Sequence, residues 1–71
     1  MYQMIYHRTG KEPKVLETVA SKIKAEEFLD LRETLAKAMD FNVVRENKSF
    51  LKLFDKNKQV GTYYWKKISE E

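Results

Sequence analysis

The sequence predicts an α+β fold: a single small domain over residues 1–71, in which one helix packs on one face of an antiparallel sheet. Three observations lead to this fold class. The chain has 71 residues, enough for one domain and no more. One central segment repeats apolar residues at helical spacing. Strand-like segments precede and follow it in the order ββαβββ, and separate blocks of strands are typical of α+β rather than parallel α/β proteins. Residues 68–71 are expected to form a frayed tail.

The N-terminal segment predicts a hairpin of two strands. Residues 2–8 are rich in aromatic and β-branched side chains, which favour strands. Residues 9–13 contain Gly10 and Pro13 and are expected to form a loop, because Gly permits positive φ and Pro cannot donate a ladder hydrogen bond. Residues 15–20 then form a second, shorter strand.

The next segment predicts a helix over residues 23–40. Its apolar residues recur every three or four positions and should form the stripe that packs on the sheet: Phe28, Leu31, Leu35 and Ala38 or Met39. Ser21 is the candidate N-cap, and Asn42 is the candidate stop, since Asn tolerates the left-handed conformation. Glu33 and Lys37 are spaced to form an i,i+4 ion pair.

Three further strands are predicted after the helix, separated by two short polar turns. The turns are Asn47-Lys48 and residues 55–58. The strands are Asn42–Glu46, Ser49–Phe54 and Gln59–Ile68. Gly61, inside the last strand, indicates a bulge or a close approach of another backbone.

These turns also predict how the strands pair, and therefore which face each side chain takes. The first turn places Val44 opposite Leu51, and the second places Leu53 opposite Val60. Alternation then directs a mainly aliphatic set toward the helix: Val44, Leu51, Leu53, Val60 and Tyr64. The other face receives a set dominated by aromatic and basic side chains: Val43, Arg45, Phe50, Lys52, Phe54, Tyr63 and Trp65. A slip of one residue in the last hairpin would move Tyr63 and Trp65 to the helix side.

Composition and charge exclude several classes of protein. No cysteine is present, so disulfide scaffolds and thiolate zinc sites are excluded. No apolar run approaches the ~20 residues of a membrane helix, and the N-terminus lacks the layout of a signal peptide, so we expect a cytoplasmic protein without membrane contact. The net charge of +3 is unevenly distributed. Residues 25–41 hold two basic and five acidic side chains, whereas residues 42–69 hold seven basic and two acidic ones.

Neither a catalytic site nor a cofactor is predicted. His7 is the only histidine, no cysteine is present as a nucleophile, and no serine sits in a G-x-S-x-G turn. With Gly10 and Gly61 as its two glycines, the chain has no glycine-rich loop to hold phosphate groups. We interpret the carboxylates of residues 26–33 as a solvated helix face rather than a metal cluster. The sequence therefore predicts a binding module rather than an enzyme.

The sheet face without a helix is the predicted binding surface. Its candidate residues combine rings and cations: Arg45, Lys48, Phe50, Lys52, Phe54, Tyr63, Trp65 and Lys66. Rings on which bases stack, surrounded by cations that meet phosphates, are typical of single-stranded nucleic-acid binding, which is the leading hypothesis. Two alternatives stay open. In the first, the same face binds a partner protein or a second copy of the chain, and the protein is a regulatory or inhibitory module. In the second, the rings are simply part of the core. Full burial of Phe50, Phe54 and Trp65 would exclude a binding face.

Overall fold

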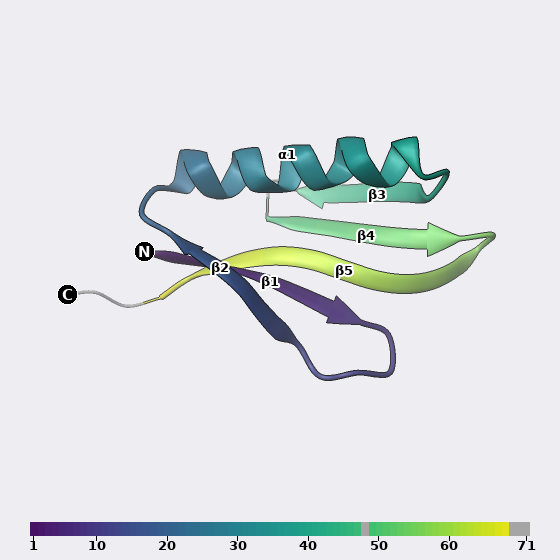
Figure 1. Cartoon of the computed structure of the whole chain (residues 1–71), viewed down its shortest axis with the longest axis horizontal. Coiled ribbons are helices and arrows are strands. Elements are labelled where there is room, and N and C mark those ends of the chain that lie inside the picture. Colours follow the sequence, from purple (N-terminus) through teal and green to yellow (C-terminus); the bar gives the residue numbers. More distant parts are fainter. Residues whose placement is uncertain (48, 69–71) are drawn as a thin grey trace.

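The computed structural model describes residues 1–47 and 49–68 (Figure 1). It confirms the predicted α+β class and the ββαβββ order of elements. The bounds in chain order are β1 Tyr2–Arg8, β2 Lys14–Val19, α1 Lys22–Ala38, β3 Asn42–Asn47, β4 Phe50–Asp55 and β5 Lys58–Lys67. Residues 69–71 of the predicted tail lie outside the described residues, and Ile68 donates its backbone N–H to the carbonyl of Met1 at 3.0 Å.

The five strands form one antiparallel sheet in the order β2-β1-β5-β4-β3. The first and last strands of the chain pair at its centre, and β2 and β3 form its edges. The helix α1 connects these two edge strands and packs against all five strands (Figure 1). We call the side of the sheet that carries α1 the helix face and the opposite side the open face.

Capping hydrogen bonds define both ends of α1, from a side chain at the N-terminus and from the backbone at the C-terminus. The Ser21 hydroxyl accepts a hydrogen bond from Lys24 N at 3.2 Å, which confirms the predicted N-cap. At the other end, Asp40 has a φ of 67°, and Phe41 N donates to Ala36 O at 3.0 Å, as in a Schellman motif. The left-handed residue is therefore Asp40 rather than the predicted Asn42, because Asp also tolerates this conformation.

The residues of α1 that pack on the sheet differ from the predicted stripe. Leu31 is 57% exposed, Leu35 is 45% exposed and Met39 is 69% exposed, so the prediction that they form the buried stripe is wrong. The buried side chains of the helix are instead Ala25, Leu29 and Ala36. Two of these are small, which allows the helix backbone to approach the sheet closely.

Ion pairs between α1 and β3 accompany this rotation of the helix. Nη1 of Arg45 lies 3.0 Å from Oδ1 of Asp30 and 3.0 Å from Oε1 of Glu33. These two carboxylates lie about one helical turn apart, so both reach the same guanidinium. Once that flank of α1 faces β3, the row that contains Leu31 and Leu35 lies on the opposite flank, beside rather than beneath the helix contact with the sheet.

The last hairpin has the predicted turn but not the predicted register. Lys56 and Asn57 both have positive φ, 53° and 71°, as a tight two-residue hairpin turn requires. The pairing of β4 with β5 then shifts by one residue, so that Leu53 pairs with Gly61. Val60 is the extra residue, so of the two features predicted at Gly61, a bulge or a close approach of another backbone, the bulge is present.

This bulge moves Tyr63 and Trp65 to the helix face and Tyr64 to the open face. Tyr63 pairs with Leu51, and its ring centroid lies 6.4 Å from that of Phe28 in α1. The predicted faces of Tyr63, Trp65 and Tyr64 are therefore wrong. The physical reason is that side chains alternate with a period of two, so one extra residue exchanges the faces.

A second irregularity, in β3, moves Val43 and Arg45 to the helix face. Val44 pairs with Lys52, one position from its predicted partner, and the register shifts between Val44 and Asn47. Val43 pairs with Leu53 on the helix face, where Arg45 also meets α1. The predicted places of Val43 and Arg45 on the uncovered face, and of Val44 beneath the helix, are wrong for the same reason.

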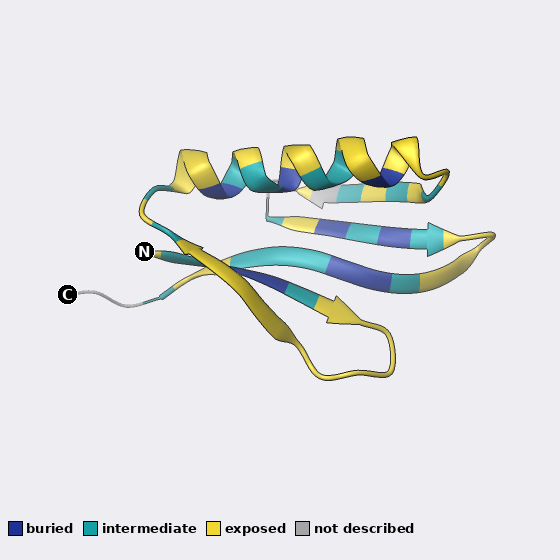
Figure 2. Ribbon diagram, viewed as in Figure 1, coloured by how far each residue is buried: buried dark blue, intermediate teal, exposed yellow. Residues whose placement is uncertain are grey.

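The core lies between α1 and the centre of the sheet. Met4, Leu29 and Leu51 are fully buried there. Figure 2 shows buried positions along the side of α1 that faces the sheet, whereas β2 is exposed along nearly its whole length. Among the described residues, α1 falls short of the length and apolarity that a membrane crossing needs.

Candidate functional site

The open face is organised in rows of side chains that cross the strands. Cross-strand partners share a face, and alternate residues of a strand return to it, so the pairing defines each row. The central row is apolar and runs through Val15, Ile5, Tyr64 and Phe50. The row beside it runs through His7, Thr62, Lys52 and Val44. On the other side of the central row, a third row contains Thr18, Gln3 and Lys66.

Two rings lie against each other in the central row. The centroids of Phe50 and Tyr64 are 5.3 Å apart and their planes differ by 15°, a stacked arrangement. Phe50 is 38% exposed and Tyr64 is half-buried. Ile5, their neighbour in the row, is only 3% exposed although it lies on the face without the helix. The rings therefore contribute to a small cluster of their own while keeping part of their surface in water.

On the described residues of β1, β4 and β5, the charges of the open face have one sign. Lys52 and Lys66 flank the apolar row, one on each side. The open-face positions of the three central strands contain no carboxylate among the described residues: Gln3, Ile5, His7, Phe50, Lys52, Phe54, Gln59, Thr62, Tyr64 and Lys66. An anion approaching these strands therefore meets cations without like-charge repulsion from the same surface.

A shallow depression extends the open face beside Phe54. It is lined by Asn42, Val44, Phe54 and Asn57. Asn42 pairs with Phe54 across β3 and β4, and Asn57 belongs to the β4–β5 turn. The two amides supply hydrogen-bond donors and acceptors next to a ring.

The structure keeps four of the eight predicted site residues together on the open face. These four are Phe50, Lys52, Phe54 and Lys66. Arg45, Tyr63 and Trp65 lie on the helix face instead, and Lys48 lies outside the described residues. Phe50, Phe54 and Trp65 all keep some exposure, so the condition that would exclude a binding face is not met.

Tyr64 belongs to the site and was missed. The predicted register placed its side chain beneath the helix, whereas the structure places it against Phe50 on the open face. The signal that could have found it is Gly61, because this glycine marks the bulge that exchanges the faces of Tyr63 and Tyr64.

Arg45 joins two elements on the helix face and lies outside the candidate surface on the open face. Its guanidinium joins β3 to two carboxylates of α1. Nζ of Lys37 lies 2.9 Å from Oε2 of Glu33, which confirms the predicted i,i+4 pair. The hydrogen bond from Lys37, and with it the contact with Arg45, holds the pKa of the Glu33 carboxyl below its ordinary value, against the opposing effect of burial.

The structure also locates the groups that were considered for catalysis or metal binding. His7 is exposed on the open face, in the row of Thr62 and Lys52. Within the described part of the chain, no three His, Cys, Asp or Glu side chains gather in a way that would hold a metal ion.

Comparison with known proteins finds no match to this chain among protein-family models, curated proteins or solved structures. The role of the open face is therefore inferred from its own geometry and chemistry.

Proposed function

We propose that this protein is a small non-catalytic binding module whose open face binds single-stranded nucleic acid. The observation that carries the proposal is the stacked pair Phe50 and Tyr64, which lies partly exposed between Lys52 and Lys66 on a surface whose central strands present no carboxylate among the described residues. Bases stack on such rings without regard to sequence, because every base has an apolar face.

The size of the surface suits a short stretch of nucleic acid. Stacking contributes about 1–3 kcal/mol per base, so one or two stacked bases give a useful but modest affinity. The lysines would meet phosphates and release counterions, which makes binding weaken as salt rises. The amides of Asn42 and Asn57, beside Phe54, are placed to hydrogen-bond the edge of a base.

Titration of a fluorescein-labelled single-stranded oligonucleotide, followed by fluorescence anisotropy at several salt concentrations, tests the proposal. We expect Phe50→Leu to weaken binding about 5- to 150-fold, because it removes a stacking ring while keeping apolar volume beside Tyr64. Phe41→Leu, which removes a ring from the helix face, is the matched control and should leave binding unchanged. Circular dichroism and thermal melts establish that both variants fold.

The lysines are tested by the slope of log affinity against log salt. Lys66→Gln should make this slope shallower by about 0.7, the contribution of one phosphate contact on a single strand. Lys22→Gln removes an exposed lysine from α1 and should leave the slope unchanged. Binding that is insensitive to salt and to Phe50→Leu would exclude the proposal.

A partner protein or a second copy of the chain is the alternative occupant of the open face. The apolar row continues to Val15 on the edge strand β2, where the side chain is exposed. Light scattering distinguishes a second copy of the chain from nucleic acid. A dimer has twice the mass of the 8.5 kDa chain whether or not an oligonucleotide is present.

A further inference from the structure

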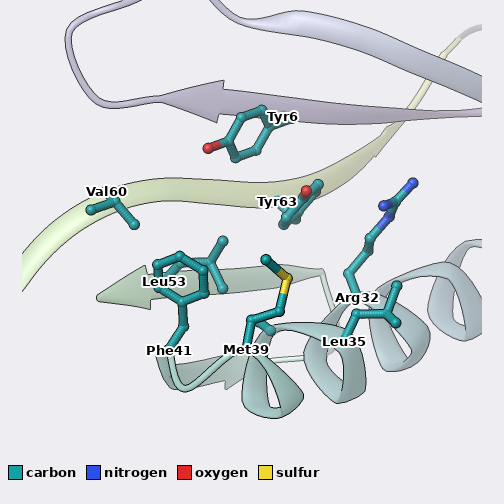
Figure 3. A pocket seen from close by; sticks show the side chains of 9 residues that line it. Tyr6, Arg32, Leu35, Met39, Phe41, Leu53, Val60 and Tyr63 are labelled. Atoms are coloured by element: carbon teal, nitrogen blue, oxygen red, sulfur yellow. The ribbon is translucent and has the colours of Figure 1, made fainter. Parts of the chain in front are cut away.

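The helix and the sheet leave a hollow between them near the C-terminal end of α1. Its volume is about 290 Å³, and Figure 3 shows aromatic and aliphatic side chains around it. Leu35, Met39 and Tyr63 are among the side chains that line it. A helix about 10 Å wide cannot cover five strands, which at about 4.8 Å spacing span about 19 Å, so part of the helix face stays open.

Arg32 is the one charged side chain that the described part of the chain contributes to the lining of this hollow. Its guanidinium carbon lies 4.8 Å from the ring centroid of Phe28 and 5.5 Å from that of Tyr63. Among the described residues it takes part in no ion pair, and its buried Nε has no hydrogen-bond acceptor. Arg45, by contrast, meets two carboxylates. The rings thus hold Arg32 in place while its charge lacks an anionic partner within the described chain.

The apolar surface continues beyond the hollow along α1. Leu31, Leu35 and Met39 follow one another at four-residue intervals and form an exposed ridge. Leu35 and Met39 belong both to this ridge and to the lining of the hollow. A small molecule confined to the hollow would leave Leu31 in water, whereas a protein segment lying along the helix would cover the whole ridge.

We infer that this hollow and ridge bind a segment of a partner protein that presents a large apolar side chain next to a carboxylate. The apolar side chain enters the hollow between Tyr63 and Met39. The carboxylate accepts charge-assisted hydrogen bonds from Arg32. Arginine and tyrosine around a desolvated pocket are the residue types that most often dominate the energy of protein interfaces.

Charge complementarity favours this occupant over the others. Nucleic acid would bring many phosphates to a hollow whose described lining offers one cation, Arg32. A second copy of the chain would have to supply a carboxylate other than Asp30 and Glu33, which are paired with Arg45, and the oligomeric state tests that case below. This site is independent of the open face, which lies on the other side of the sheet.

Selection from a phage-displayed library of random nine-residue peptides on the immobilised full chain tests the inference. We expect the selected peptides to carry an Asp or Glu beside an aromatic or large aliphatic residue. Synthetic copies should bind Arg32→Gln about 10- to 100-fold more weakly than the original protein, with Arg32→Lys between the two. Leu35→Gln should also weaken binding, and because Leu35 is largely exposed this variant should keep its thermal stability.

Phe50→Leu and Lys66→Gln, on the open face, are the matched controls and should bind the peptides normally. Failure to select acidic and apolar peptides, or equal binding to Arg32→Gln, would overturn the inference. So would a dimer that Leu35→Gln dissociates, since a second copy would then be the occupant, or displacement of the peptides by an oligonucleotide. Loss of oligonucleotide binding in the open-face variants does not bear on peptide binding to the hollow and ridge, so the two sites are tested separately.

Discussion

Tyr63 and Tyr64 are neighbours on β5, yet the two faces of the sheet use them differently. On the helix face, Tyr63 lies against Tyr6 with centroids 4.6 Å apart and meets Phe28 and the guanidinium of Arg32. On the open face, Tyr64 stacks on Phe50. On the helix face the ring therefore contacts side chains of α1, including a charged one, whereas on the open face the two rings stack on each other between lysines.

The contrast between these two tyrosines shows that strand register, more than composition, decides what a ring does. The same aromatic residues would have produced a larger aromatic and basic surface without the bulge at Val60. With the bulge, rings are shared between a face covered by the helix and an uncovered face on which they stay partly exposed. Three changes test this division, in order of decreasing effect.

The largest effect is expected from Leu29→Ala, in the core beneath α1. Leu29 is fully buried, so its truncation should lower the free energy of unfolding by about 2–5 kcal/mol, enough to unfold much of a domain this small. Leu31→Ala, on the exposed ridge, should cost much less, within about 0.5 kcal/mol. Urea denaturation followed by circular dichroism measures both. Equal losses would show that the helix is rotated differently.

A smaller effect is expected from Gly61→Val, at the bulge. A Cβ at Gly61 would lie 2.7 Å from Cε1 and Oη of Tyr6, so the ring must move. We expect a loss of about 1–3 kcal/mol, typical of overpacking. In a Tyr6→Leu background the same substitution should cost less, and a double-mutant cycle measures the difference. Equal cost in both backgrounds would mean that Tyr6 does not lie over Gly61.

The smallest effect is expected from Glu33→Gln, at the ion pairs that join α1 to β3. The lowered pKa of Glu33 means that the unfolded chain binds a proton more readily than the folded one. This stabilisation is present above the ordinary value of 4.5 and is lost as the pH falls below it. Glu33→Gln should therefore cost at most about 1 kcal/mol at pH 7, and the difference should shrink in acid.

Urea denaturation at neutral and acidic pH measures this difference. Glu27→Gln is the control, because Glu27 forms no ion pair among the described residues. A Glu33→Gln effect that does not change with pH would argue against a charged contact.

Local patterns were enough to predict the element order, the helix cap at Ser21, the tight turn at Lys56-Asn57 and a bulge or a close backbone approach at Gly61. Each depends on residues within a few positions of one another. The same patterns predicted half of the candidate site. They failed at Tyr63 and Trp65, because Gly61 left a bulge and a close approach of another backbone equally open, and pairing with β4 decides between the two.

The order of residues along the chain is enough to specify an α+β domain with one helix, and to concentrate rings and lysines in the C-terminal strands. Which rings lie in the open, and which row of α1 meets the sheet, depends on contacts between elements that are distant in the chain. The physical reason is that alternation and helical periodicity define two sides of each element within the sequence. Contacts between elements, such as those of Arg45 with α1, then decide which side faces the core.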